Sequence, residues 1–296
     1  MALNLSTFRT RTLTAAVFVV VMLTGLLWSQ WGFFILFSVI HFGCWVEYQK
    51  LVGKMDSDYA QLTPFHKYGV MIAGWCIMLY FAGDSLSIPG VRLSALGWWP
   101  VLIFLLLSPV IELLFTRSFK LKNTGYSLLG LLYISLSWGL LMNLGSMPVE
   151  SAGKTWYRVI PIVLIASIWI NDTMAYIVGS LIGKTPFSKI SPKKTWEGTA
   201  GGAILCVLVV ALAAQYIAPL NESGLAAQHW IAIAAIAAVA GTAGDLLESK
   251  LKRMANVKDS GSFMPGHGGF LDRFDSLLVA TPFVWIYIIC ISLDRC

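Results

Sequence analysis

The chain has 296 residues, of which 57% are hydrophobic and only 12% are charged. A soluble domain carries about 25% charged residues, so this composition excludes an ordinary water-soluble enzyme. The net charge of +6 would suggest a nucleic-acid partner in a soluble protein. In a membrane protein it reflects basic cytoplasmic loops and attraction to anionic lipid, so we expect membrane lipids and no nucleic acid as partners.

Long apolar runs recur along the chain and predict an all-α, polytopic integral membrane protein with about nine transmembrane helices. The first run follows Arg9 and Arg11, as in a signal peptide, but Trp28-Ser-Gln-Trp31 is no small-residue cleavage site, so we expect a retained span. The nine expected spans are 13–28, 31–47, 68–83, 97–115, 124–145, 159–182, 200–218, 230–247 and 277–293.

The distribution of lysine and arginine predicts the orientation. With nine spans, 17 of the 21 basic residues fall on the side of the N-terminus and the even-numbered loops. The positive-inside rule then places the N-terminus in the cytoplasm, and we expect a bacterial cytoplasmic (inner) membrane. We expect one membrane domain in which 1–150 supplies about five spans and 151–296 supplies the rest. The polar segments 170–202 and 241–276 would both face the cytoplasm.

The first polar segment begins inside an expected span. Asp172 lies deep in 159–182, where an ionised carboxylate is unfavourable by at least ~2.5–3.5 kcal/mol. Such a residue indicates a metal or proton ligand, and the alternative is a packing pair with Asn171 or Tyr176. We expect this carboxylate to be buried.

Four lysines follow Asp172 and indicate an anion site. Ser191-Pro192 is a typical helix start, with the serine as cap and the proline in the first turn. A helix N-terminus beside lysines binds anions. The alternative is a basic flank that only orients the protein in the membrane. The lysines are Lys184, Lys189, Lys193 and Lys194.

The second polar segment places acids and a base on one helix face. On a helix, Asp245, Glu248, Ser249 and Lys252 fall at i, i+3, i+4 and i+7. A Glu248–Lys252 surface pair would explain two of them. It leaves Asp245, beside an alanine-rich span, without an explanation.

The third polar segment, 256–276, combines glycines with acids. Gly261, Gly266, Gly268 and Gly269 permit close approach of the backbone to a ligand. Asp272 and Asp275 are one turn apart at the start of the last expected span, where either could cap the helix. Two acids exceed what capping requires.

These residues together predict phosphoryl or nucleotidyl transfer. Carboxylates suit a hard cation such as Mg²⁺, which usually also binds a substrate phosphate. The basic residues would bind the remaining phosphate oxygens, and catalysis would rest on positioning and charge neutralisation. No Cys/His cluster has the spacing of a soft-metal site. A phosphate nucleophile is anionic at neutral pH and needs no protein base.

The stretch SKLKRMANVKDSGSFMPGHGGFLDRFD, residues 249–275, closely resembles the signature of the phosphatidate cytidylyltransferase (CDP-diacylglycerol synthase) family. The upstream residues Asp172-Thr-Met-Ala-Tyr176, Gly183-Lys184, Ser191-Pro-Lys-Lys-Thr195 and Glu197-Gly198 resemble the family's other polar block. The likeness covers about a third of the chain, 170–276. Met174 and Met264 depart from the family pattern without removing a charge.

The resemblance implies that CTP and phosphatidate give CDP-diacylglycerol and pyrophosphate. Asp245 and Asp272 would hold the catalytic metal pair with Asp172 nearby, and Asp275 would bind metal or only cap its helix. The family is associated with Mg²⁺ and a companion K⁺, and a homodimer is expected by analogy. Lys252 and Arg253, with the lysines that follow Asp172, would hold the CTP phosphates and the lipid headgroup. The other implied substrate-binding residues are Lys184, Ser191, Lys193, Lys194, Glu197, Glu248, Ser249, Lys258, Asp259, His267, Gly268, Gly269 and Arg273.

Three other functions fit some of the same residues. A CTP-dependent lipid kinase would use similar acids and bases but would release CDP. An ion-coupled transporter also has acids within its spans, although its sites lie near the midplane between repeats. A non-catalytic lipid-binding scaffold would keep its lipid binding after Asp245→Asn.

Overall fold

The computed structural model describes residues 5–86, 88–89, 91, 93–115, 120–151, 154–221, 225–263 and 268–293. The chain divides into two compact units. Unit one is Met1–Asn143 with Leu251–Arg273, and unit two is Leu144–Lys250 with Phe274–Cys296. The polar segment 251–273 therefore packs with the N-terminal spans, a relation that sequence order does not reveal.

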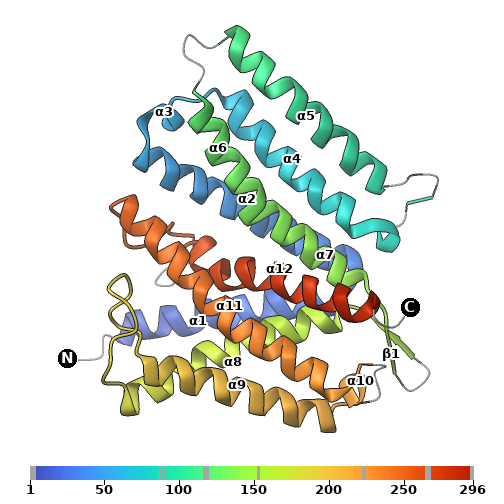
Figure 1. Ribbon diagram of the computed structural model, residues 1–296, viewed down its shortest axis with the longest axis vertical. Coiled ribbons are helices and arrows are strands. Elements are labelled where there is room, and N and C mark those ends of the chain that lie inside the picture. Colours follow the sequence, from blue (N-terminus) through green and yellow to red (C-terminus); the bar gives the residue numbers. More distant parts are fainter. Residues whose placement is uncertain are drawn as a thin grey trace. The chain divides into compact units, whose positions relative to one another are not determined.

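Almost all of the regular structure is helical (Figure 1). In the first half of the chain the elements are α1 (Leu5–Leu27), α2 (Gln30–Met55), α3 (Ser57–Ala60), α4 (Pro64–Ala82), the 3-10 turn Gly83–Ser85, α5 (Leu93–Phe115), α6 (Leu121–Gly130), the π-helical turn Leu131–Leu136 and α7 (Ser137–Ser146). An antiparallel hairpin follows, formed by β1 (Val149–Ser151) and β2 (Lys154–Trp156). The remaining helices are α8 (Val159–Ile182), α9 (Trp196–Tyr216), α10 (Ala218–Asn221), α11 (Ala227–Met254) and α12 (Leu271–Leu293).

Seven helices in the described part of the chain are long and apolar enough to cross a membrane. They are Gln30–Met55, Leu93–Ile111, Leu121–Ser146, Val159–Ile182, Trp196–Tyr216, Ala227–Met254 and Leu271–Leu293. The expected spans 13–28 and 68–83 are also helical, in α1 and α4, but are not among the seven. The all-helical prediction is confirmed, whereas the count of nine and the orientation stay predictions.

Unit one is organised around α2. Buried aromatic side chains of α2, including Phe37 and Trp45, fill its core. His41 is also buried, and its Nε2 lies 3.0 Å from Ser135 Oγ, which accepts a hydrogen bond from Trp45 Nε1 at 2.8 Å. This contact gives one nitrogen of the buried ring a partner and indicates a packing role for His41.

Helices α2 and α4 of unit one run antiparallel. Trp75 Nε1 donates to Ser38 Oγ at 2.9 Å, and Gln49 Nε2 donates to the carbonyl of Lys67 at 2.9 Å. Asp56 ends α2 and caps the short helix α3 through a bond from the Asp58 amide at 3.0 Å. The two helices are thus joined by a tight, capped turn.

In unit two, α8 and α9 pack closely through small residues. A Cβ atom on Gly202 would lie 2.8 Å from the carbonyl oxygen of Asn171, so the α9 backbone touches α8 there. Cys206 Sγ donates to the carbonyl of Ser167 at 3.2 Å, one turn further along. Ser167 and Asn171 therefore lie on the α8 face that contacts α9, and both are buried.

Candidate functional site

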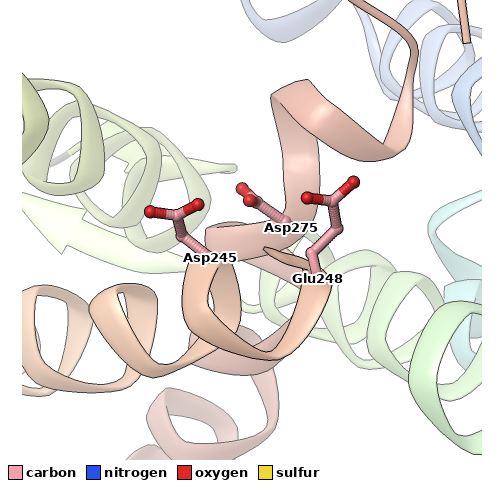
Figure 2. Close-up of side chains that lie close together, drawn as sticks. All are labelled: Asp245, Glu248 and Asp275. Atoms are coloured by element: carbon pink, nitrogen blue, oxygen red, sulfur yellow. The ribbon is translucent and has the colours of Figure 1, made fainter. Parts of the chain in front are cut away.

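Three carboxylates from two helices gather in unit two (Figure 2). Asp245 and Glu248 lie one turn apart on α11, and Asp275 lies on α12. One ligand oxygen from each lies within 4.8 Å of the other two. Glu248 is fully buried, Asp275 is 7% exposed and Asp245 is half-buried. We call these three residues the acidic cluster.

A glycine contact brings the helices of the acidic cluster together. A Cβ atom on Gly244 would lie 2.5 Å from the carbonyl oxygen of Asp275 and 3.0 Å from the Cα of Ser276. The absence of a side chain at Gly244 therefore lets the α11 backbone reach α12. Asp245, the next residue, is delivered beside Asp275 by this approach.

Lys194 supplies a positive charge to the acidic cluster. Its Nζ forms an ion pair with Asp245 Oδ2, and the two side chains are 30% and 26% exposed. Burial lowers the pKa of Lys194, while the negative charges of Asp172 and Asp275 act in the opposite direction. Several carboxylates so close together repel one another when ionised, which favours the binding of a cation among them.

The donor set of the acidic cluster fits a hard divalent cation. It consists of carboxylate oxygens alone, which are ligands that Mg²⁺ and Ca²⁺ accept and that soft metals do not select. Mg²⁺ commonly takes one or two carboxylates and fills its other positions with water and substrate phosphate. Glu248, which was predicted to bind substrate, is one of the three acids that could hold a metal ion in this structure.

Asp172 is exposed, contrary to the prediction that it is buried. The preceding residue, Asn171, occupies the α8 face that packs on α9. Successive residues on a helix are about 100° apart, so Asp172 projects from a different side of α8 than Asn171 does. Its negative charge nevertheless acts to raise the pKa of Lys194, so Asp172 lies within electrostatic reach of that lysine.

Helix α9 begins later along the chain than predicted, after the loop 183–195. The helix starts at Trp196, and Thr195 is its cap, accepting a bond from the Gly198 amide at 3.1 Å. Ser191 and Pro192 lie in a turn closed by the Lys194 amide and the Ser191 carbonyl at 3.1 Å. The predicted helix start at Ser191 is wrong, because residues 191–194 form a turn whose Lys194 carbonyl accepts from the Phe187 amide at 2.7 Å, and Thr195 caps the helix.

Glu197 fastens this loop to α9. Its carboxylate accepts bonds from the Lys184 and Thr185 amides at 3.2 Å and from Thr185 Oγ1 at 2.8 Å. These contacts fix the backbone that carries Lys184. Lys184 and Lys193 are exposed.

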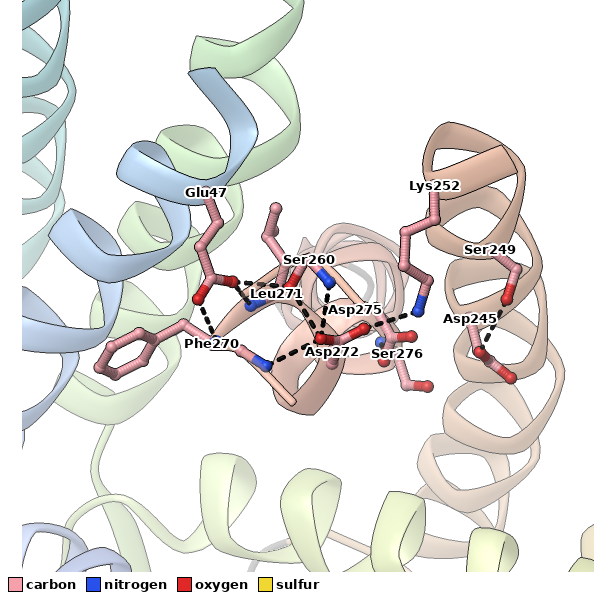
Figure 3. Close-up of polar contacts among 11 residues, drawn as sticks. Glu47, Asp245, Ser249, Lys252, Ser260, Phe270, Leu271, Asp272, Asp275 and Ser276 are labelled. Carbon is pink, nitrogen blue, oxygen red and sulfur yellow. Dashed lines mark hydrogen bonds and ion pairs between the residues drawn. The ribbon is translucent and has the colours of Figure 1, made fainter. Parts of the chain in front are cut away.

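Asp272 is held by a dense set of hydrogen bonds in unit one (Figure 3). Its Oδ1 accepts from Lys252 Nζ at 2.6 Å, and the two side chains are 14% and 10% exposed. Its Oδ2 accepts from the Ser260 amide and hydroxyl, both at 2.9 Å, and from the Gly269 amide at 2.8 Å. The structure thus brings together Lys252 and Asp272, two residues that the sequence marked for catalysis.

Glu47 of α2 is a further member of this unit-one network that the sequence analysis missed. Its Oε1 accepts from the Phe270 amide at 2.9 Å, and its Oε2 accepts from the Leu271 amide at 2.9 Å and from Ser260 Oγ at 2.7 Å (Figure 3). Glu47 is only 5% exposed. It therefore caps the start of α12, where backbone N–H groups lack helical partners. The one sequence signal was an acid closing the apolar run 31–47.

The remaining predicted site residues occupy varied positions. Ser249 Oγ lies 3.5 Å from Asp245 Oδ1, a weak contact within α11. Gly268 has φ of +83°, the left-handed region that favours glycine. Arg253, Lys258, Asp259 and Arg273 are exposed, Ser191 is half-buried, and Gly269 is buried. His267 lies outside the described residues, as does Met264.

Comparison with known proteins agrees with these observations. The model of the cytidylyltransferase family matches residues 9–291. A protein of Bacillus subtilis (strain 168) named phosphatidate cytidylyltransferase is 32% identical over 219 residues, covering 74% of this chain and 76% of the relative. A Staphylococcus aureus (strain COL) protein of the same name is 43% identical over 125 residues, covering 41% of this chain and 46% of the relative.

A third relative, from Arabidopsis thaliana, is named phosphatidate cytidylyltransferase 4, chloroplastic. It is 41% identical over 118 residues, which cover 40% of this chain and 29% of the relative. The family match spans nearly the whole chain, including both helices of the acidic cluster. This chain therefore belongs to the cytidylyltransferase family and is a nucleotidyltransferase.

Proposed function

We propose that the protein transfers the cytidylyl group of CTP to phosphatidate, giving CDP-diacylglycerol and pyrophosphate in phospholipid synthesis. The names of the relatives and the signature in residues 249–275 support this substrate pair. The observation that carries the proposal is the acidic cluster with Lys194 beside it. Carboxylates that hold a cation and an ammonium that binds phosphate are what a nucleotidyl transfer requires.

The reaction needs no protein base. An oxygen of the lipid phosphate attacks the α-phosphorus of CTP, and a new P–O bond forms as the α–β phosphoanhydride bond breaks. Pyrophosphate leaves with the bonding electrons. Because a phosphate monoester has its second pKa near ~6, the attacking oxygen is already anionic at neutral pH. The protein's task is to align two anions and to lower their repulsion.

Each group of residues has a part in this task. Asp245 and Asp275, with Glu248, would hold Mg²⁺, which neutralises phosphate charge and aligns the reacting oxygens when bound. Lys194, with Lys184 and Lys193, would bind nucleotide phosphates. The proposal also includes Asp172 and Asp272 as metal ligands. It includes K⁺ as a companion ion. In unit one, Lys252, whose Nζ pairs with Asp272 at 2.6 Å, would bind phosphate.

The membrane setting follows from the substrates. Phosphatidate and its product keep their acyl chains in the bilayer, whereas CTP arrives from water. We therefore propose that the site opens to the cytoplasm, that the N-terminus lies on the same side, and that the chain crosses a bacterial inner membrane nine times. A homodimer is an expectation from the family resemblance alone.

The decisive experiment is an assay of the purified protein with CTP, phosphatidate and Mg²⁺. We expect release of pyrophosphate, and labelled CMP retained in the lipid. Release of CDP would instead establish a lipid kinase. Asp245→Asn and Asp272→Asn should each abolish the CDP-lipid product while the protein still inserts and folds. Asp272→Asn should also lower the melting temperature, because Lys252 and the Ser260 and Gly269 amides lose a charged acceptor. Asp58→Asn, at a surface carboxylate paired with Lys120, is the matched control and should retain activity. Turnover like that of the wild type in either test variant would refute its assignment.

A further inference from the structure

Unit one contains a pocket of about 580 Å³ whose rim is basic. It lies between the C-terminal end of α2 and the beginning of α4, and Ser260 forms part of its wall. Lys50 and Lys54 reach it from α2, and Lys67 reaches it from α4. Its size is within the ~300–1,000 Å³ range of small-ligand sites. In the sequence, these lysines indicate only the orientation of the chain in the membrane.

The lysines of this pocket are positioned to hold an anion. Lys50 and Lys54 are one turn apart on α2 and exposed. Both the side chain and the backbone of Lys67 are held in place. Its Nζ donates to the Ala60 carbonyl at 2.6 Å, and its own carbonyl accepts from Gln49 Nε2 at 2.9 Å. None of the described residues that line the pocket is an acid.

Three acids of unit one on α2 and α3 or at their junction are engaged elsewhere. Glu47 accepts bonds from the start of α12, Asp56 pairs with Lys122 at 2.7 Å, and Asp58 pairs with Lys120 at 2.5 Å. The positive charge at the pocket is therefore not cancelled by these carboxylates. A phosphate monoester carries about −1.5 to −2 charges at pH 7 and three acceptor oxygens, which suits three ammonium groups.

Apolar surface leads away from the lysines along the two helices. Val46 lines the pocket on α2, and Val39 and Ile35 follow on the same face, 57% and 58% exposed. On α4, Tyr68 lines the pocket and Ile72, one turn further, is 53% exposed. Because α2 and α4 are antiparallel, both stripes run in the same direction from the pocket. This arrangement matches a phosphate head with acyl chains, not a soluble nucleotide.

The pocket also contacts the network that holds Asp272. Ser260, part of the pocket wall, bonds through its hydroxyl to Glu47 at 2.7 Å and to Asp272 at 2.9 Å. We propose that this pocket binds the phosphomonoester headgroup of the lipid substrate, with Lys50, Lys54 and Lys67 around the phosphate and the apolar stripes along the acyl chains. The identity of the lipid rests on the proposed function, and the site itself rests on the geometry of unit one.

The test is direct binding of phosphatidate to the full-length protein in nanodiscs without CTP, so that turnover plays no part. Lys50→Gln/Lys54→Gln should weaken phosphatidate binding about tenfold or more, since each lysine near a lipid phosphate contributes about 1 kcal/mol. Lys250→Gln removes an exposed lysine of α11 outside the pocket and should change binding less than twofold. Lys50→Arg/Lys54→Arg keeps both charges and should restore binding, which separates loss of charge from misfolding.

Competitors identify the ligand. Glycerol 3-phosphate has the headgroup without chains and should compete only weakly, and phosphatidylglycerol, a phosphodiester, should be bound less tightly than phosphatidate. Unchanged binding in Lys50→Gln/Lys54→Gln would overturn the proposal. Equal loss for phosphatidylglycerol would overturn the choice of a phosphomonoester, and full competition by glycerol 3-phosphate would overturn the role of the apolar stripes. If phosphatidate binds as expected but the wild type forms no CDP-lipid, the pocket stands and the proposed function fails.

In the active enzyme, the same double substitution should raise the KM for phosphatidate about tenfold or more while leaving the KM for CTP within twofold. A rise in both constants would contradict a pocket that is specific for the lipid.

Discussion

Glu47 and Asp272 share one hydroxyl group: Ser260 Oγ lies 2.7 Å from a Glu47 oxygen and 2.9 Å from an Asp272 oxygen. A serine hydroxyl carries one proton and donates to one acceptor at a time. The Ser260 amide, which donates to Asp272, supplies a second donor at the same residue. Ser260 thus joins the carboxylate that caps α12 to the carboxylate that orients Lys252.

Glu47→Gln should impair the enzyme by loosening the start of α12. The substitution replaces an acceptor-only group with an amide whose NH₂ cannot accept from the Phe270 or Leu271 amides. We expect a stability loss of about 1–3 kcal/mol and a lower kcat, because a buried donor is left unsatisfied. Thermal unfolding in detergent and steady-state kinetics measure both effects. Asp58→Asn, an acid–amide exchange at an exposed carboxylate, is the control for the loss of a charge and should leave stability close to that of the wild type. Stability of Glu47→Gln equal to the wild type would contradict the capping role.

Gly269→Ala should be destabilising because the space for a side chain is occupied. A Cβ atom there would overlap the carboxylate of Glu47. We expect a loss of about 1–3 kcal/mol, the usual effect of overpacking. Gly125→Ala is the matched control, since nothing lies within 4 Å of a Cβ atom at that position in α6. Alanine favours a helix over glycine by about 1 kcal/mol, so this variant should be neutral or stabilising. Equal melting temperatures for the two variants would refute the steric argument.

Chelation should abolish activity, and Mg²⁺ should restore it. Asp275→Asn and Glu248→Gln each remove a charged ligand from the acidic cluster, and we expect the Mg²⁺ concentration for half-maximal activity to rise at least about tenfold. Titration of activity with Mg²⁺ after chelation measures this. The Asp58→Asn control should follow the wild-type curve. A variant of the acidic cluster with the wild-type Mg²⁺ requirement would remove its residue from the metal site.

Asp56 should make unit one sensitive to acid. The hydrogen bond from Lys122 is the largest of the influences that lower the pKa of Asp56. A lowered pKa means that the folded state favours the ionised carboxylate, so its stabilisation is present above the ordinary carboxyl pKa of about 3.9. It is lost as the pH falls through the lowered value. Asparagine also caps helices well, so Asp56→Asn mainly removes the charge.

The melting temperatures of wild type and Asp56→Asn should accordingly differ most at neutral pH. The difference should shrink as the pH falls below about 4. A gap that widens in acid would show that the ion pair with Lys122 is not its source.

The sequence predicted the acids of α11 and α12 because helical spacing alone puts them on shared faces. Asp245 and Glu248 are three residues apart, and the amphipathic reading of 241–253 needed no tertiary information. The exposure of Asp172 could not be predicted in this way. It depends on which face of α8 contacts α9, and that choice is made by glycines on the partner helix.

Two other features depend on contacts distant in sequence or on competition between local signals. The late start of α9 reflects a backbone pairing that outweighs the Ser191-Pro192 signal, with Thr195 as the better cap. Glu47 is 223 residues from the Phe270 amide that it accepts, so no local pattern could connect them. Its role became visible only with the fold.

The long reach of Glu47 has a consequence for biogenesis. Its hydrogen-bond partners Ser260, Phe270 and Leu271 follow it by 213, 223 and 224 residues. At a synthesis rate of roughly 5–20 residues per second, the nascent chain carries Glu47 for about 10–45 s before those partners emerge from the ribosome. During that interval α2 must insert with a carboxylate that has yet to meet its final donors. A segment translated 213 or more residues after Glu47 therefore completes the hydrogen bonding of an N-terminal helix.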